Sequence, residues 1–409
     1  ADAPTPWRVS FLLSLKQQAA FLPRTIPWHR PGWLILRYLQ ALIAVGLCLP
    51  QHQSLALDGL VLFKQQLAQL RLPDGVLATR HLGQQRAVME AITYLQSLLR
   101  QAGHTPPPEF DDALEALGQS LALLLLPNGQ PPAFYQQDVD QAPEIDAVLR
   151  LAHQDPPKQT QFFPAAGLAR LHQGDGVVLV DAGVLKRGMD ASTTSASFGS
   201  FEFAQRGRLV VVNQGTCGFK AHQVERHRQA AAHNSVEVGG RGPVVVWGEA
   251  GLGQQPRHVQ AHVEQEIGLG AGIEITHDGY PGYTHTRRLF LNAAGDSLRG
   301  EDVITGRAPT TVTAYFHLAP KIQVKLKSKV EAELTGPGLP PLALKVRGGS
   351  LSLQDGTSLR TYTEHLAHHT LVLQGDWRQN GCTLRWGIMP NPGYKTAVAN
   401  HLDATAHDE

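Results

Sequence analysis

The chain has 409 residues, a formal net charge of +1, 17% charged residues and 42% hydrophobic residues. This length predicts two to three domains, and the apolar fraction is sufficient to bury a sizeable core. The sequence has no block of basic residues, which excludes the electrostatic footprint of a nucleic-acid-binding protein. Its three cysteines lie far apart without a CxxC pair, so neither a disulfide framework nor structural zinc is predicted.

Helical periodicity runs from residue 7 to about residue 152, with apolar side chains spaced three and four apart. The clearest runs are 54–72, 86–99 and 111–126, and turns rich in proline and glycine separate them. Such helices with short connections are typical of helical hairpins that pack side by side. We therefore predict an α-helical domain over residues 1–153.

The most apolar stretch of this half, 33–49, contains Arg37 and Gln40 and is short for a bilayer span. It favours a buried core helix, and no transmembrane segment is predicted. The first seven residues lack a basic region followed by an apolar core, so no signal peptide is visible.

The residue composition changes in the second half of the chain. Residues 154–164 are polar and contain prolines, which predicts a linker. From residue 165 to residue 409, short β-branched runs alternate with glycine-rich turns, which predicts an all-β sandwich or barrel and a multidomain α plus β fold. The expected strands include 177–181, 200–204, 209–213, 235–238, 244–247, 272–276, 287–292, 311–318, 342–346 and 370–373.

Several segments of the β half follow one another in a characteristic order: 200–203 (SFEF), 208–215 (RLVVVNQG), 230–236 (AAAHNSV), 276–280 (THDGY), 284–289 (THTRRL), 298–302 (LRGED) and 316–320 (FHLAP). In order and spacing they resemble the β domain of the heparinase II/III-like polysaccharide lyases. In the helical half, residues 41–46 and 72–75, with Arg80, resemble that family's toroid helices and active-site loop. The family normally has more helix before this point. The resemblance therefore implies an incomplete α/α toroid of helical hairpins, followed by a large antiparallel β-sandwich. It also implies a bacterial protein of the periplasm or cell envelope.

The resemblance implies β-elimination on a polysaccharide that contains uronic acid. One group must neutralise the sugar carboxylate, because otherwise the C5 proton stays too weakly acidic. A base must remove that proton, and an acid must protonate the leaving oxygen at C4. Family members use Asn or His, sometimes with Arg, for the first role and Tyr and His for the others. Many also hold a structural metal with His and Asp ligands.

This sequence departs from the family pattern at most of these positions. Trp33 and Leu34 stand where an Asn-His pair is expected, and Gln84 and Gln85 stand where a Tyr-His pair is expected. The His-x-His-x-Asp run is replaced by 193–197 (TTSAS), and Asn213 takes the place of the metal-binding aspartate. His233 is retained. No cofactor is assigned. A structural divalent metal is left open, although its usual ligands are absent.

Three residues are the candidates for catalysis: His233, Tyr280 and His285. His233 is next to Asn234 at an expected strand start, where a lone histidine can also be a satisfied packing residue. Tyr280 follows His277 and Asp278 on a glycine-bearing turn, and the alternative is an Asp-Gly hairpin turn with a packing tyrosine.

The candidates for substrate binding are Arg80, Asn234 and Arg287. Because His285 and Arg287 are two apart, a strand would point both to one face, where the arginine could hold a carboxylate bidentately. The alternative is a solvated polar face. Arg80 is the carboxylate partner expected from the helical half, and its alternative is an ordinary surface arginine.

No metal site is predicted at His365, His368 and His369, because their helical spacing falls among strands. The function that the resemblance implies is a polysaccharide lyase with an acidic polysaccharide as its partner. The alternative is a catalytically degenerate glycan-binding or scaffold protein of the same architecture. The sequence gives no oligomeric state.

Overall fold

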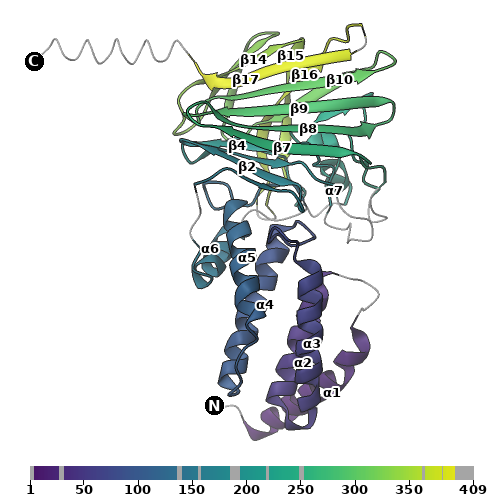
Figure 1. Ribbon diagram of the computed structural model, residues 1–409, viewed down its shortest axis with the longest axis vertical. Coiled ribbons are helices and arrows are strands. Elements are labelled where there is room, and N and C mark those ends of the chain that lie inside the picture. Colours follow the sequence, from purple (N-terminus) through teal and green to yellow (C-terminus); the bar gives the residue numbers. More distant parts are fainter. Residues whose placement is uncertain are drawn as a thin grey trace, which may run out of the picture. The chain divides into compact units, whose positions relative to one another are not determined.

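A computed structural model of the protein describes residues 4–26, 32–135, 141–154, 158–184, 194–217, 221–247, 253–361, 364–379 and 381–391. These residues form two compact units, one helical and one mostly β (Figure 1). The helical unit extends to Leu121 and includes Val148–Gln154, and the β unit contains most of the remaining described residues. Residues 155–157 of the predicted linker lie outside the described residues, and the predicted domain boundaries stay a prediction.

The amphipathic runs of the first half form the expected helices, which are α1 (Thr5–Thr25), α2 (Trp33–Cys48), α3 (Gln53–Leu70), α4 (Leu82–Gln101), α5 (Glu109–Leu123) and α6 (Ala142–Leu151). Helix α2 packs against α3 and α4. Small residues permit the α2–α3 contact, since a Cβ on Gly46 would lie 2.3 Å from the backbone nitrogen of Ala56. In the described segments, no helix combines the length and hydropathy of a membrane-crossing helix.

In its described residues, the β unit contains three sheets in which all paired strands are antiparallel. A five-stranded sheet has the order β1-β2-β3-β4-β5, an eight-stranded sheet the order β12-β13-β14-β17-β10-β9-β8-β7, and a four-stranded sheet the order β15-β16-β11-β6. The short helix α7 (Ala221–His227) belongs to the same unit. The strands are β1 (Gln161–Phe163), β2 (Leu168–Gln173), β3 (Gly176–Asp181), β4 (Phe201–Gln205), β5 (Arg208–Val211), β6 (Val236–Val238), β7 (Val259–Glu266), β8 (Gly270–Tyr280), β9 (Tyr283–Asn292), β10 (Leu298–Gly306), β11 (Val312–His317), β12 (Gln323–Ser328), β13 (Glu331–Thr335), β14 (Leu342–Arg347), β15 (Gly349–Ser358), β16 (Leu366–Gly375) and β17 (Gly381–Pro390).

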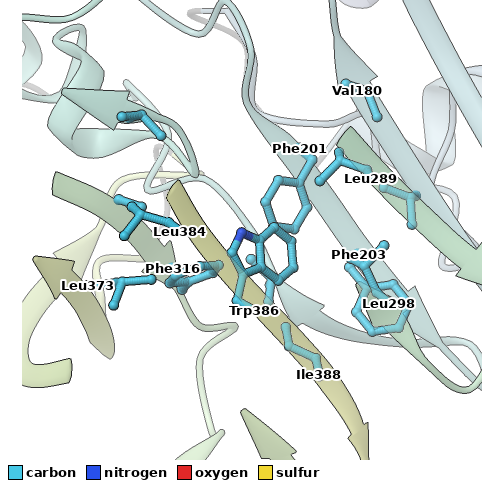
Figure 2. Close-up of a cluster of buried hydrophobic side chains, with 14 of the residues drawn as sticks. Val180, Phe201, Phe203, Leu289, Leu298, Phe316, Leu373, Leu384, Trp386 and Ile388 are labelled. Atoms are coloured by element: carbon cyan, nitrogen blue, oxygen red, sulfur yellow. The ribbon is translucent and has the colours of Figure 1, made fainter. Parts of the chain in front are cut away.

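One hydrophobic core joins the three sheets, because alternate residues of their strands point to a shared interior. Figure 2 shows Trp386 of β17 between Phe201 of β4 and Phe316 of β11. Its ring stacks on Phe201 with centroids 5.2 Å apart and meets Phe316 edge-on at 4.9 Å. Gly300 makes room for the indole, since a Cβ there would lie 2.1 Å from the ring. Trp386 therefore connects all three sheets.

The predicted fold class, helical hairpins followed by a large antiparallel β-sandwich, is confirmed. Two local expectations are wrong. Residues 244–247 form no strand, because Val245 exchanges its backbone hydrogen bonds with the nearby Gly253 and Gln254. The turn expected at Asp278 and Gly279 is instead an irregularity inside β8. The Asp278 carboxylate accepts hydrogen bonds from the backbone N–H groups of residues 257 and 258, so it ties down a neighbouring segment.

Candidate functional site

One buried polar cluster in the β unit surrounds a single carboxylate. We call it the Asp302 network, and it consists of His277, His285, Arg287, Asp302 and Trp386. Arg287 donates to both carboxylate oxygens of Asp302, from Nε at 2.6 Å and from Nη2 at 3.1 Å. His285 Nε2 lies 2.9 Å from Oδ1, and Trp386 Nε1 donates to Oδ2 at 3.3 Å. His277 extends the chain, with its Nε2 3.0 Å from His285 Nδ1.

Strand register places these groups together. Arg287 on β9 lies directly across from Asp302 on β10, and His285 is two residues away on the same face, as the sequence predicts. Both side chains are buried, so the alternative of a solvated polar face is wrong. Burial by itself would raise the pKa of Asp302, but Arg287 and His285 outweigh it and hold that pKa well below its usual range.

Arg287 also joins the eight-stranded sheet to the segments packed on it. Its Nη1 donates to the backbone carbonyls of Gly199, at 2.6 Å, and Asn234, at 2.8 Å. Its charge is therefore matched by Asp302, and its donors are shared among three parts of the chain. This arrangement supports a role in holding the sandwich together.

Both polar atoms of the Asn234 side chain form hydrogen bonds within the β unit. Its Nδ2 donates to the carbonyl of Phe201 at 2.9 Å, and its Oδ1 accepts from the backbone N–H of His317 at 2.6 Å. Its own N–H donates to Asn213 Oδ1 at 2.8 Å. Asn213, at the position of the family's metal-binding aspartate, thus serves as an internal hydrogen-bond acceptor.

Tyr280 and His285 lie side by side, with ring centroids 5.9 Å apart. The Tyr280 hydroxyl donates to the backbone carbonyl of Val236 at 2.5 Å, and burial raises its pKa above the ordinary value. Burial lowers the pKa of His285, although Asp302 opposes that shift. Both rings therefore lie inside the unit, where burial opposes the charged form of each.

Another buried cluster, which we call the imidazole cluster, contains His233, His317, His368, Gln214 and Thr370. Gln214 Nε2 lies 3.1 Å from His317 Nδ1 and 3.3 Å from His368 Nε2, and Thr370 Oγ1 lies 2.8 Å from His317 Nδ1. His233 is completely buried, and neither of its ring nitrogens has a hydrogen-bond partner among the described residues. Burial and the nearby His227 lower its pKa to about 3. It is therefore an uncharged ring at neutral pH.

In the part of the chain that the structure describes, no group of three or more His, Cys, Asp or Glu side chains could hold a metal ion. The imidazole cluster has no carboxylate, and the Asp302 carboxylate is occupied by Arg287, His285 and Trp386. The donor set present therefore does not fit the family's His and Asp metal centre.

Arg80 belongs to the helical unit, on the loop between α3 and α4. It is only 4% exposed and adopts a left-handed φ of 60°, so the ordinary surface arginine considered as its alternative is wrong. The loop is fixed by Gln85, which accepts from Leu77 N–H at 2.9 Å and donates to the carbonyl of Leu117 at 2.8 Å. Gln85, which the resemblance places nearest to an expected Tyr-His pair, anchors the loop.

The structure brings Asn234, Tyr280, His285 and Arg287 together around the Asp302 network, while the His233 ring belongs to the imidazole cluster and Arg80 to the other unit. Asp302, Gln214 and Trp386 were not among the site residues predicted from the sequence. Asp302 and Gln214 had a signal in the sequence, because both lie in family-like segments, 298–302 and 208–215. The assignments of catalytic and substrate-binding roles stay predictions.

Comparison with known proteins identifies the class to which this architecture belongs. A crystal structure of heparinase III shares the fold with a TM-score of 0.79 at 14% identity, over 94% of this chain and 65% of that one. The heparan sulfate lyase HepC from Pedobacter heparinus has a TM-score of 0.72 at 15% identity, over 94% and 65% of the two chains. At such identities the likeness concerns the fold, which is a helical toroid followed by a β-sandwich.

The sequence comparisons are more specific. The family described as heparinase II/III-like, C-terminal, matches residues 155–387. This chain therefore belongs to the heparinase II/III-like family. FtsZ-localized protein C of Caulobacter vibrioides is 29% identical over 253 residues, which are 59% of this chain and 43% of that protein. The chain thus spans less than half of this relative and about 65% of the lyase structures.

Proposed function

We propose that this protein binds an acidic polysaccharide and that its buried polar residues stabilise the β unit without carrying out β-elimination. One observation supports this most: the polar groups nominated for catalysis and carboxylate binding in the β unit are at most 2% exposed. Family membership supports the ligand class, since the names of the similar solved structures identify heparin-type lyases.

The requirements of β-elimination explain why the burial of these groups argues against catalysis. The reaction needs a cation or amide next to the sugar carboxylate, a base and an acid. Arg287 is engaged by Asp302 and two carbonyls, and Tyr280 is engaged by Val236. A raised pKa also makes Tyr280 harder to convert to the phenolate that would act as base. These groups are thus committed to the fold.

Mixing the protein with heparan sulfate, hyaluronan, alginate and glucuronan tests the proposal. We expect heat of binding to at least one polymer in a calorimetric titration, without the ultraviolet absorbance of an unsaturated uronate. Chitosan oligosaccharide and dextran serve as cationic and neutral controls. Absorbance that rises with time and is abolished by His233→Ala would overturn the proposal.

A lyase is the second candidate, and similarity of fold to heparinase III over most of the chain favours it. His233 is then the base to examine first, because its ring is neutral and its nitrogens have no partner among the described residues. His233→Ala should lose turnover while His104→Ala, on the exposed surface, should retain it.

A scaffold role is favoured by the similarity to FtsZ-localized protein C. Sedimentation with FtsZ polymers examines this role directly. Protein that pellets only when FtsZ is polymerised, and does so without added polysaccharide, would place the scaffold role ahead of glycan binding.

A further inference from the structure

The outer face of the eight-stranded sheet has a row of charged residues that runs across the strands. Arg288 on β9, Glu301 on β10, Arg385 on β17 and Arg347 on β14 lie directly opposite one another in the strand register. Glu301 accepts from Arg288 Nη1 at 2.9 Å and from Arg385 Nε at 2.5 Å. The charges alternate until the end of the row, where two arginines stand opposite each other.

Like charges directly across a strand pair are destabilising. Glu301 is already shared by two arginines, so it leaves little charge for Arg347. The next strand, β13, pairs with β14 only as far as Lys345, so no residue of β13 lies opposite Arg347. Across the described residues, neither Arg347 nor Arg378 takes part in an ion pair. The end of the row therefore has surplus positive charge.

This surplus charge lines a hollow of about 500 Å³. Its lining includes Arg347, Arg378, Arg385, Thr305, Thr383 and Asp376. Gly348 forms part of the wall, with a φ of 87°, and a Cβ there would lie 2.0 Å from the carbonyl of Thr383. The turn after β14 can therefore approach β17 closely only with glycine at this position.

The hollow lies on the opposite face of the sheet from the Asp302 network. Neighbouring residues of a strand point to opposite faces, so Arg385 points outward where Trp386 points inward, and Glu301 outward where Asp302 points inward. The hollow is formed by residues of the β unit alone. It is therefore a separate site from the buried clusters.

We propose that this hollow binds the carboxylate or sulfate group of an acidic sugar. The proposal rests on the proposed function and names its binding site. Guanidinium groups hold planar or tetrahedral oxyanions through paired N–H donors, and the two threonine hydroxyls add further donors. The volume falls within the range of small-molecule sites, so a sugar ring can accompany the anionic group.

Asp376 sets the preference for a sugar acid over a free anion. Its carboxylate is a lining group of the hollow, on an exposed residue. A carboxylate repels a second anion but accepts hydrogen bonds from sugar hydroxyls. We therefore expect a uronate oligosaccharide to bind more tightly than inorganic sulfate.

The test compares Arg347→Ala/Arg378→Ala with the control Arg299→Ala/Lys325→Ala, which removes the same charge from exposed strand positions outside the hollow. Calorimetric titrations use a heparan-derived tetrasaccharide, sodium sulfate and a neutral tetrasaccharide. We expect affinity for the acidic tetrasaccharide to fall about tenfold or more in the first variant and less than about twofold in the control. Thermal unfolding verifies that both variants are folded.

The outcomes separate the two proposals. Unchanged affinity in Arg347→Ala/Arg378→Ala overturns the assignment of this hollow and leaves glycan binding by the protein standing. Absence of binding by the native protein to all four acidic polymers overturns the proposed function. Sulfate binding without tetrasaccharide binding, if the double substitution removes it, overturns the sugar-acid assignment and identifies the hollow as a simple anion site. Asp376→Asn should strengthen sulfate binding and weaken tetrasaccharide binding, and the reverse result contradicts the role given to Asp376.

Discussion

The two faces of the eight-stranded sheet carry nearly the same ion pair in two different environments. On the inner face Arg287 meets Asp302, and both side chains are at most 2% exposed. One position away on the two antiparallel strands, on the outer face, Arg288 meets Glu301, with exposed fractions of 51% and 22%. The chemistry is alike and the distances are similar, so the environment decides what each pair contributes.

Water screens the outer pair and can replace either partner. The inner pair has no such replacement, because removing one ion leaves the other buried without compensation. The comparison teaches that the inner pair stabilises the fold, whereas the outer charges remain available to a ligand. Substitutions of the inner pair should therefore change the free energy of unfolding, whereas substitutions of the outer charges should change ligand affinity.

The largest effect is expected for Arg287→Ala. This change leaves Asp302 charged and buried and removes two hydrogen bonds to backbone carbonyls. We expect the free energy of unfolding to fall by about 3–5 kcal/mol, as measured by urea denaturation. Replacing both ions, in Arg287→Met/Asp302→Leu, should cost less than the single change. A loss below about 1 kcal/mol for Arg287→Ala would mean that water reaches the pair.

A smaller effect is expected from the pH dependence of His233. Its pKa is about 3 when folded, against about 6.5 in the unfolded chain, so the unfolded state takes up the proton first as pH falls. Native stability should therefore decline below pH about 6.5, until the folded ring protonates. Between pH 7.5 and pH 5 this one ring accounts for a loss of about 2 kcal/mol.

His233→Gln should remove that contribution, so that the unfolding free energy changes by about 2 kcal/mol less between these two pH values. His104→Gln, on the exposed surface, is the matched control. An identical pH profile for His233→Gln and the native protein would contradict the burial of this ring.

The smallest effect is expected for Arg288→Ala on the outer face. Loss of its contacts with Glu274 and Glu301 should change the unfolding free energy by no more than about 1 kcal/mol. Added salt should reduce even this difference, since the groups are exposed. A loss comparable with that of Arg287→Ala would erase the distinction between the two faces.

Much of the fold was predictable because its patterns are local. Helical spacing located α3, α4 and α5, and β-branched runs between glycine turns located strands such as β3, β9 and β14. The segment at 244–247 has the composition of a strand, but its backbone partners depend on how the following loop returns. Such pairing is a property of tertiary structure, which composition does not contain.

The candidate site was less predictable because its burial depends on the packing of three sheets whose strands lie far apart in the sequence. The two-residue spacing of His285 and Arg287 correctly predicts a shared face, but it does not say whether that face meets water or core. Asp302 resolves the question, since it lies across from Arg287 and 15 residues away in the chain. The surplus charge at Arg347 likewise emerges only from the order of strands.

The bidentate contact between Arg287 and Asp302 has a consequence for how the sequence can evolve. A lineage that loses either residue alone would carry a sandwich with an uncompensated interior charge, so viable descendants should keep both or exchange both for apolar residues. Trp386 and Gly300 form a similar couple, because the indole occupies the space that any larger side chain at position 300 would fill. Divergence at the centre of this domain should thus proceed by pairs, while exposed charged residues outside the hollow are free to change one at a time.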